Sequence, residues 1–232
     1  MGGARRLSLL MLTCLAACST VEGSPTGVPT TTTTPPVVTT TAPSTTTIPP
    51  TTPVPPTTTT AVGQQSAGWT ITVYYTAVES FHSGERKRVR GCPKIDCANG
   101  SDDLGSYPAD FVEAVESEGT GRTASGKYLN WSHDSGFWLD TAPRDTNGGV
   151  LEPFVSAAAD GLPKGARVKI VSCGQTDVCA KFRSASWVIK DSFTPGLGGT
   201  KHIDLYLGEE NGPRFTESAW YTTFTQAVLL IG

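Results

Sequence analysis

The sequence predicts a mainly β protein, a barrel or a sandwich, which follows a long segment that does not fold. Five short runs rich in Val, Ile and aromatic residues lie between turns of Gly, Pro, Asn and Asp, and such runs are typical of short strands. Many short strands with few helices indicate an all-β architecture. The predicted strands span residues 69–75, 154–158, 167–171, 186–190 and 202–206.

Two segments have the pattern of a helix. In residues 108–118, Pro108 suits the first turn and apolar side chains recur on one face. A second helix is predicted for residues 218–230. Residues 119–149 are polar, glycine-rich and carry aromatic side chains, which favours a long loop, or a loop with a hairpin, over a groove.

The N-terminal region is typical of an exported, lipid-anchored bacterial protein. Arg5 and Arg6 precede an apolar run at residues 7–15, and two alanines then lead to Cys18. This is the form of a signal peptide with a lipoprotein box, in which Cys18 becomes the acylated first residue. Ordinary secretion with cleavage nearby is the alternative. The apolar run is too short to span a membrane.

Composition divides the chain into three parts. Residues 1–17 are the predicted signal peptide, and residues 18–65 are a lipidated N-terminus followed by a disordered linker of mainly Thr and Pro. The linker has too few apolar residues to offset the chain entropy that folding would remove. Residues 66–232 have an ordinary globular composition. We therefore expect one folded, monomeric domain in the cell envelope, outside the cytoplasm and anchored to the membrane by lipid.

Four cysteines remain in the predicted domain, an even number that suggests disulfides in an exported protein. The short intervals favour the local pairs Cys92 with Cys97 and Cys173 with Cys179, although two cross-pairings stay open. A four-cysteine zinc site is the competing interpretation, but its usual intervals are shorter and the compartment is oxidising. We expect no cofactor and no metal.

The charge balance and the missing motifs exclude several classes of function. A formal net charge of -3 does not suit a strongly basic nucleic-acid-binding protein. The sequence has no phosphate-binding loop and no dinucleotide fingerprint. Its three histidines, His82, His133 and His202, stand far apart, which disfavours metal or histidine-assisted nucleophilic chemistry. Carboxylates remain, the usual groups that cleave glycosidic bonds.

Three aspartates stand out by position. Asp160 and Asp191 each follow a predicted strand, and Asp204 lies within one. Alternation along that strand places His202, Asp204 and Tyr206 on the face opposite its apolar residues. A carboxylate on a strand that is otherwise built for burial needs a partner or a function. Each aspartate could also cap a turn or accept hydrogen bonds from backbone amides.

Four segments together resemble the three-aspartate (3D) domain of the membrane-bound lytic transglycosylase A group, a relative of the rare lipoprotein A and expansin barrels. The segments are 121–126 (GRTASG), 154–170, 188–191 (VIKD) and 198–208 (GGTKHIDLYLG). The resemblance covers roughly residues 70–208. It implies a six-stranded double-psi β-barrel with one or two short helices and long loops. It also implies that the substrate is peptidoglycan or a related polysaccharide.

The resemblance also implies roles for the aspartates. Asp160, Asp191 and Asp204 match the three aspartates of the family, with Asp204 as the general acid and base and Asp191 as its catalytic neighbour. Asp204 would protonate the glycosidic oxygen and then accept a proton from the sugar's own 6-hydroxyl, which leaves a 1,6-anhydro ring. The loop of residues 192–199 departs from the compact Thr-Gly-Gly turn of the family, so the separation of Asp191 and Asp204 is left open.

Further residues are candidates for substrate binding. Asp160, Lys190 and His202 belong to the same strands and turns as the catalytic candidates, while Tyr128 and Trp131 could stack on sugar rings. For the lysine and the histidine a hydrated surface position is the alternative, and for the aromatic residues it is packing within a loop.

The predicted function is cleavage of cell-wall glycan, as a peptidoglycan lytic transglycosylase. Two carboxylates on either side of a water would instead give an inverting glycoside hydrolase. A protein of the expansin type, which binds and loosens polysaccharide without cutting it, is the main alternative that is not an enzyme. A secreted inhibitor or adhesin on the same scaffold is a weaker one.

Overall fold

A computed structural model of the protein describes residues 63–232. The predicted signal peptide, the lipidation site Cys18 and nearly all of the predicted linker lie outside this part. The described chain has two α-helices, two single-turn 3₁₀ helices and eleven strands. In order they are β1 (Gln64–Val78), a 3₁₀ turn (Glu79–Phe81), β2 (Arg86–Gly91), β3 (Asp102–Pro108), α1 (Ala109–Glu118), β4 (Thr120–Arg122), β5 (Tyr128–Ser132), β6 (Gly136–Asp140), β7 (Ser156–Ala158), β8 (Arg167–Ser172), α2 (Asp177–Ser184), β9 (Trp187–Asp191), β10 (His202–Glu209), a 3₁₀ turn (Phe215–Glu217) and β11 (Phe224–Ile231).

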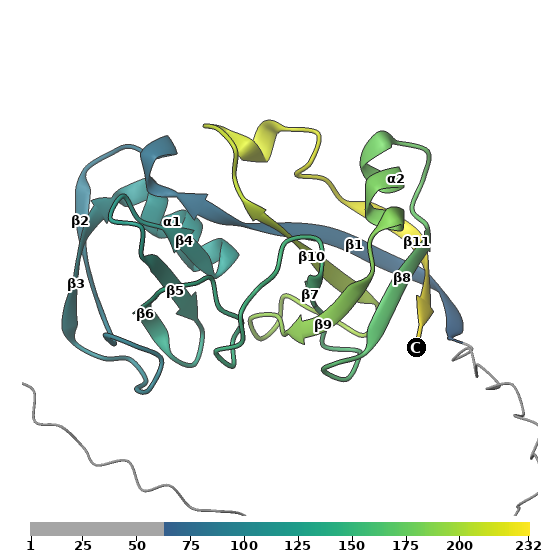
Figure 1. Cartoon of the computed structure of the whole chain (residues 1–232), viewed down its shortest axis with the longest axis horizontal. Helices are drawn as coiled ribbons and strands as arrows, with labels where there is room; N and C mark the ends of the chain where they lie inside the picture. The colour runs from purple at the N-terminus through teal and green to yellow at the C-terminus, as the bar shows by residue number, and fades with distance from the viewer. Residues whose placement is uncertain (1–62) are drawn as a thin grey trace, which may run out of the picture. The chain divides into compact units, whose positions relative to one another are not determined.

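Six of these strands close into a barrel, which lies on the right in Figure 1. The strand order is β10, β7, β9, β8, β11 and β1, and β1 pairs again with β10 to complete the ring. The ring is mixed, because β1 runs parallel to β10 and β7 parallel to β9, while the other four pairs are antiparallel. The predicted mainly β fold class with a six-stranded barrel is confirmed, and all five predicted strands are barrel strands.

The predicted helix at residues 218–230 is wrong, because most of this segment is strand β11. β11 pairs antiparallel with both β1 and β8, so it is the strand that closes the barrel. Ala227 and Leu229 are fully buried at alternate positions. The run of apolar residues at 227–231 fits a helix and a strand equally well by periodicity, and only its pairing partners decide between them.

The remaining strands and α1 form a second group, which we call the α/β lobe (residues 79–150), on the left in Figure 1. It contains the hairpin β2–β3, helix α1 and the strands β4, β5 and β6. The last residues of the long strand β1, Ala77 and Val78, pair with β4, so a single strand belongs to both the barrel and the lobe. Buried residues from both groups form one continuous hydrophobic core.

Helix α1 confirms the first predicted helix within one residue at its start. Phe111, Val112 and Val115 are fully buried on one face, as the helical spacing predicts. The helix ends at Gly119, which has a φ of 84° and donates its N–H to Val115 O at 2.9 Å. A left-handed residue at this position favours glycine, and it directs the chain into β4.

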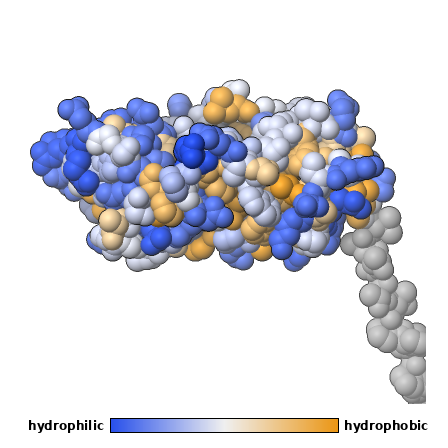
Figure 2. All heavy atoms as spheres, turned by 90° about the horizontal axis from the view of Figure 1, so that it is seen from above, coloured by the Kyte–Doolittle hydropathy of each residue, from blue (hydrophilic) through white to orange (hydrophobic). Residues whose placement is uncertain are grey.

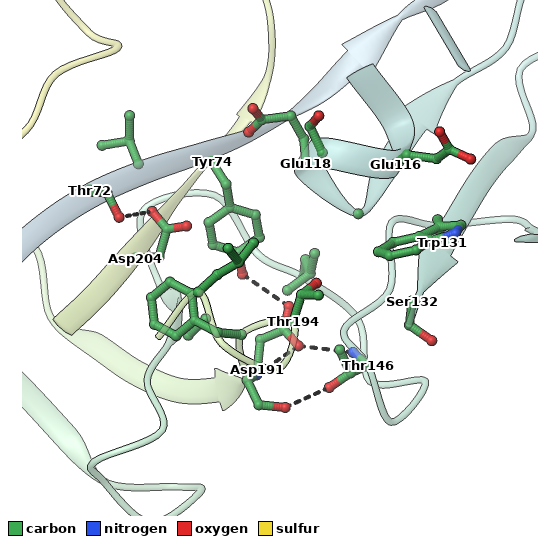
Figure 3. A pocket seen from close by; sticks show the side chains of 18 of the residues that line it. Thr72, Tyr74, Glu116, Glu118, Trp131, Ser132, Thr146, Asp191, Thr194 and Asp204 are labelled. Carbon is green, nitrogen blue, oxygen red and sulfur yellow. Dashed lines mark hydrogen bonds between the residues drawn. The ribbon is translucent and has the colours of Figure 1, made fainter. Parts of the chain in front are cut away.

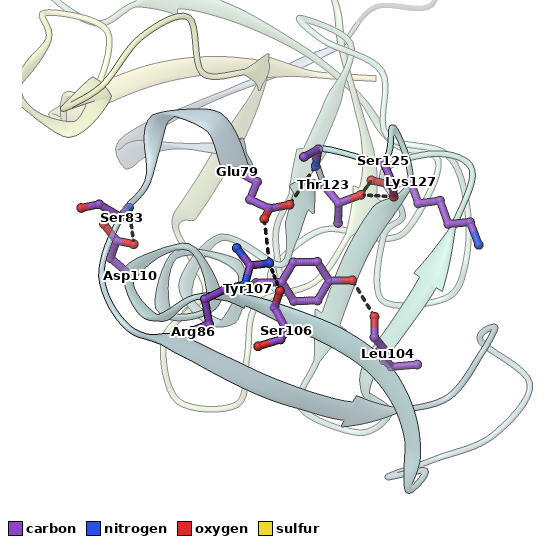
Figure 4. Close-up of polar contacts among 11 residues, drawn as sticks. Glu79, Ser83, Arg86, Leu104, Ser106, Tyr107, Asp110, Thr123, Ser125 and Lys127 are labelled. Atoms are coloured by element: carbon purple, nitrogen blue, oxygen red, sulfur yellow. Dashed lines mark hydrogen bonds and ion pairs between the residues drawn. The ribbon is translucent and has the colours of Figure 1, made fainter. Parts of the chain in front are cut away.

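The predicted loop at residues 119–149 contains the strands β4, β5 and β6, of which the last two form a hairpin. Its first turn is held by the buried carboxylate of Glu79, which accepts a hydrogen bond from Ala124 N at 2.8 Å and contacts Arg86 at 3.4 Å (Figure 4). Thr123 accepts the N–H of Gly126 at its backbone oxygen and bonds Lys127 O through its hydroxyl. The segment 121–126 therefore has a structural role at the junction with β1.

Helix α2 was not predicted, and it closes one side of the barrel core. Its first residues are capped by Thr176, whose hydroxyl accepts the N–H of Cys179 at 3.1 Å. Phe182 from this helix is fully buried, as is Trp187 at the start of β9, and the two rings meet edge to face at 6.0 Å. The Trp187 indole N–H donates to Phe182 O at 3.1 Å, so the ring has no unpaired polar group.

Both disulfides join neighbouring cysteines. Cys92 pairs with Cys97 in the α/β lobe, and Cys173 pairs with Cys179, which ties the end of β8 to helix α2. The local pairing favoured by the short intervals is therefore what the structure has.

The face of the described part that is seen in Figure 2 is mostly polar. Figure 2 shows hydrophilic residues over most of the α/β lobe, with apolar residues exposed in separate groups. Four large apolar side chains in residues 63–232 are exposed: Phe81, Val150, Leu197 and Tyr221. Of these, Leu197 and Tyr221, at 66% and 39%, border the groove described below. Neither described α-helix has the length and apolar character that a membrane span requires.

Candidate active site

A groove of about 310 Å³ is lined by residues of both the barrel and the α/β lobe. The barrel contributes β1, β9, β10 and the loop after β9, and the lobe contributes the end of α1, strand β5 and the loop before β7. Figure 3 shows Asp204 and Trp131 on opposite sides of this groove. The groove is therefore built by both parts of the fold.

Asp204 lies in the groove on β10, opposite Thr72 of β1 in the parallel register. Its neighbours Ile203 and Leu205 are fully buried on the other face, which confirms the predicted alternation. Asp204 Oδ1 accepts a hydrogen bond from the Thr72 hydroxyl at 2.7 Å. Burial, together with the charge of Asp191, raises the pKa of Asp204 to about 7 against the opposing effect of the hydrogen bond from Thr72.

Thr72 connects Asp204 to His202, which lies on the same face of β10. His202 Nε2 is 2.8 Å from the Thr72 hydroxyl oxygen. Because the single hydroxyl proton goes to Asp204, His202 Nε2 is the donor in this contact when Asp204 is ionised. The imidazole also lies against Phe193, with ring centroids 4.4 Å apart. These contacts hold the carboxyl of Asp204 in one orientation.

We expect the change Thr72→Val to move the alkaline limb of the pH profile of kcat/KM to higher pH. Valine keeps the shape but removes a hydrogen bond that stabilises the ionised form of Asp204, so the pKa of that carboxyl rises. A hydrogen bond to a charged group corresponds to about one pH unit. Thr72→Ser keeps the hydroxyl and serves as the control. An unchanged limb in the valine variant would show that the observed ionisation belongs to another group.

Asp191 is the last residue of β9 and is 8% exposed. Its Oδ1 accepts the backbone N–H groups of Thr146 and Ser192, both at 2.9 Å, while Oδ2 lies 3.5 Å from the Tyr74 hydroxyl. Burial raises the pKa of Asp191, and the backbone N–H groups oppose that rise. One oxygen of Asp191 is thus committed to holding the loop at residue 146 against the barrel.

Strand pairing sets the relation between the two aspartates. Ala158 of β7 pairs with Asp204 on one side and with Asp191 on the other. The two aspartates therefore stand on strands separated by one strand, so their backbones are about 10 Å apart. The longer loop of residues 192–199 does not separate them, because β7 rather than this loop determines their spacing.

Tyr74 lies beside both aspartates, and the buried charges of Asp191 and Asp204 add to burial in raising the pKa of its phenol well above the usual range. It is therefore a neutral hydroxyl at all ordinary pH values. Its ring packs against Tyr206 at 5.2 Å.

Glu118, which sequence patterns did not single out, also lines the groove. It is the last residue of α1, half-buried, and its Oε2 accepts Tyr75 N at 3.3 Å while Oε1 accepts the Tyr221 hydroxyl at 3.2 Å. Burial and the charge of Asp204 raise the pKa of Glu118 to about 8. The only sequence signal for this residue was its place at the end of a predicted helix, which many surface glutamates share.

Of the five predicted substrate-binding residues, two line the groove and three do not. Trp131 and His202 line the groove, whereas Asp160, Lys190 and Tyr128 are not among its lining residues. Asp160 accepts the N–H of Phe193 at 3.1 Å and so supports the loop that carries Phe193 into the groove. Lys190 pairs with Glu152 at 2.7 Å, and the Tyr128 hydroxyl donates to Glu209 at 2.8 Å.

No three His, Cys, Asp or Glu side chains within residues 63–232 are grouped as metal ligands. The polar side chains that line the groove carry carboxyl, hydroxyl, imidazole and guanidinium groups. Two carboxyls with a pKa near neutrality, Asp204 and Glu118, can each donate or accept a proton at physiological pH.

The fold and the site define a class, a mainly β protein with a closed six-stranded barrel and carboxyl groups that line a groove beside it. Solved structures of similar fold are lytic transglycosylases. One is Escherichia coli MltA with bound chitohexaose, 14% identical, with 72% of each chain covered and a TM-score of 0.48. Another is a membrane-bound lytic murein transglycosylase from Agrobacterium tumefaciens, 11% identical, covering 70% of this chain and 73% of that one, with a TM-score of 0.45. MltA from Neisseria gonorrhoeae is 13% identical, with 71% and 72% covered and a TM-score of 0.42. No family model and no curated protein matches the sequence.

Proposed function

We propose that this protein cleaves the glycan strands of peptidoglycan, or of a closely related polysaccharide, as a lytic transglycosylase in which Asp204 is the general acid and base. The observation that carries the proposal is the position of Asp204. It is a groove-lining carboxyl, held by Thr72, whose pKa of about 7 keeps a proton available near neutral pH. General acids in glycosidic cleavage need such a raised pKa.

The proposed reaction needs one carboxyl. Asp204 gives its proton to the glycosidic oxygen as the bond to C1 breaks and positive charge develops on the sugar. The resulting carboxylate then takes the proton of the sugar's 6-hydroxyl while O6 bonds to C1. The proton lost by Asp204 is thereby restored, no water is consumed, and the product carries a 1,6-anhydro end.

Asp191 is proposed as a positioning residue rather than a base that activates water. Its Oδ1 accepts two backbone N–H groups and its Oδ2 faces the Tyr74 hydroxyl, so the carboxylate joins the loop at residue 146 to the barrel. Its negative charge instead favours the protonated form of Asp204. This division of roles favours lytic transglycosylation over inverting hydrolysis by an aspartate pair.

Trp131 and Phe193 support a sugar as the ligand. Both line the groove together with the exposed Leu197, and such apolar faces beside hydrogen-bonding groups suit the faces of pyranose rings. We further propose that the enzyme works as a monomer in the cell envelope outside the cytoplasm, anchored through lipidated Cys18, with its Thr/Pro-rich linker as a spacer.

The test is product analysis. Purified protein is incubated with peptidoglycan, and the released fragments are identified by mass before and after chemical reduction of their ends. We expect 1,6-anhydro ends, which resist reduction. New reducing ends would identify a hydrolase instead, and binding without release of fragments would identify a wall-binding protein of the expansin type.

A further inference from the structure

Glu118, the last residue of helix α1, lines the groove, and its carboxyl forms no ion pair within residues 63–232. Arg144, the arginine that lines the groove, is engaged by Asp140 at 2.8 Å. Glu118 is also at the C-terminus of its helix, where the helix dipole is negative and disfavours an anion.

Negative charges on neighbouring elements also disfavour the ionised form of Glu118. From β10 and the segment after it come Asp204 and Glu210, whose charges both act on Glu118. From β1 comes only the Tyr75 backbone N–H, and from the segment before β11 only the Tyr221 hydroxyl. On its own helix the nearest groove-lining acid is Glu116. Burial and the charges of Asp204 and Glu210 favour the protonated form of Glu118, and they outweigh the two hydrogen bonds, which favour the carboxylate.

We propose that Glu118 is a glycan-binding residue that works as a neutral carboxylic acid and donates a hydrogen bond to an oxygen acceptor of the bound sugar opposite Asp204. The proposal rests on the proposed function, because it concerns the same groove. The Tyr75 N–H is fixed by the backbone and directed to Oε2, so we place the proton on Oε1, where a lone pair still accepts the Tyr221 hydroxyl. A protonated carboxyl is the form that can donate to a hydroxyl or acetamido oxygen.

Strand β1 sets the spacing between Asp204 and Glu118. Tyr75 lies three residues beyond Thr72 on β1, and three residues along a strand span about 10 Å. Thr72 holds Asp204 and Tyr75 holds Glu118, so these two contacts on one strand keep the two carboxyls apart along the groove. A glycan that contacts Asp204 with its scissile bond thus brings a neighbouring polar edge to Glu118.

The experiment measures binding of a β-1,4-linked N-acetylglucosamine hexamer by calorimetry, in the Asp204→Asn background, where cleavage does not interfere. The parent is the Asp204→Asn protein. At pH 6 we expect the added change Glu118→Gln to leave the affinity within about twofold of the parent, because the amide also donates a hydrogen bond. We expect Glu118→Ala to bind about fivefold more weakly than the parent. Between pH 6 and pH 9.5 we expect the parent to lose about fivefold in affinity as Glu118 ionises, while the glutamine variant stays constant. Glu116→Gln, at the same helix end, is the matched control and keeps the pH dependence of the parent.

Several outcomes would overturn the proposal. Tighter binding at high pH would mean that Glu118 acts as a carboxylate acceptor, and equal binding by the parent and Glu118→Ala at pH 6 would mean that it does not touch the glycan. Cleavage of peptidoglycan by the wild-type protein, in either case, would leave the proposed function standing while this inference fails. Urea denaturation of each variant separates a lost contact from a lost fold.

Discussion

Replacement of Asp204 by Asn is expected to lower kcat/KM for glycan cleavage by about 10²- to 10⁴-fold, the usual contribution of a general acid. Asparagine keeps the size of the side chain and can still contact the Thr72 hydroxyl, but it has no proton to transfer to the glycosidic oxygen. The measurement is the rate of fragment release from peptidoglycan. Full activity in this variant would remove Asp204 from the mechanism.

The same carboxyl should set the pH dependence of the wild-type enzyme. Asp204 must carry its proton at the start of the reaction, and its pKa is about 7. Activity is therefore expected to fall about tenfold per pH unit above pH 7. An enzyme whose activity depended on an ordinary aspartic acid would already have lost its general acid near pH 4.

The free energy of unfolding, measured at two pH values, provides a control for the Asp204→Asn variant. The folded state holds the proton of Asp204 up to about pH 7, whereas the unfolded chain releases it near pH 3.9. Between these values the folded state binds the extra proton, so ionisation of Asp204 makes the native protein less stable as the pH rises. Asp204→Asn removes this effect. We expect the variant to be more stable than wild type at pH 8 and similar at pH 4 by urea denaturation, which would separate lost chemistry from lost folding.

The largest loss of stability is expected for Trp187→Ala, at about 3 to 5 kcal/mol of unfolding free energy. Trp187 is 0% exposed, meets Phe182 edge to face, and donates its indole N–H to Phe182 O. Alanine would leave a cavity between β9 and α2 and remove the indole hydrogen bond to Phe182 O, which would keep only the N–H of Ala185 at 3.3 Å. Urea denaturation monitored by far-ultraviolet circular dichroism measures the change.

Trp131→Ala is the matched control for this prediction. Trp131 has the same side chain but is only partly buried at the edge of the groove. Its removal should cost clearly less stability, because much of the lost contact area already faces solvent. Equal losses for the two tryptophans would show that the core is not centred on the contact between Trp187 and Phe182.

Local patterns were sufficient for most of the barrel. Alternation in residues 202–206 and the β-branched runs of β8 and β9 predict strands because a pleated strand buries every second side chain. The pattern failed at residues 224–231, where apolar residues are consecutive and the period is ambiguous. It also missed α2 and the hairpin β2–β3, whose short polar sequences carry little apolar periodicity.

The sequence by itself determined the chemical type of the site and one of its residues with a clear physical reason. Asp204 is a carboxylate on an otherwise buried strand, and that conflict is visible without coordinates. Only the tertiary structure decided that Asp191 is held by backbone amides, that Asp160, Lys190 and Tyr128 are not among the groove-lining residues, and that Glu118 lines it. These facts depend on how β1 joins the barrel to the α/β lobe. Contacts between segments more than a hundred residues apart, such as Thr72 with Asp204, leave no local periodicity in the sequence.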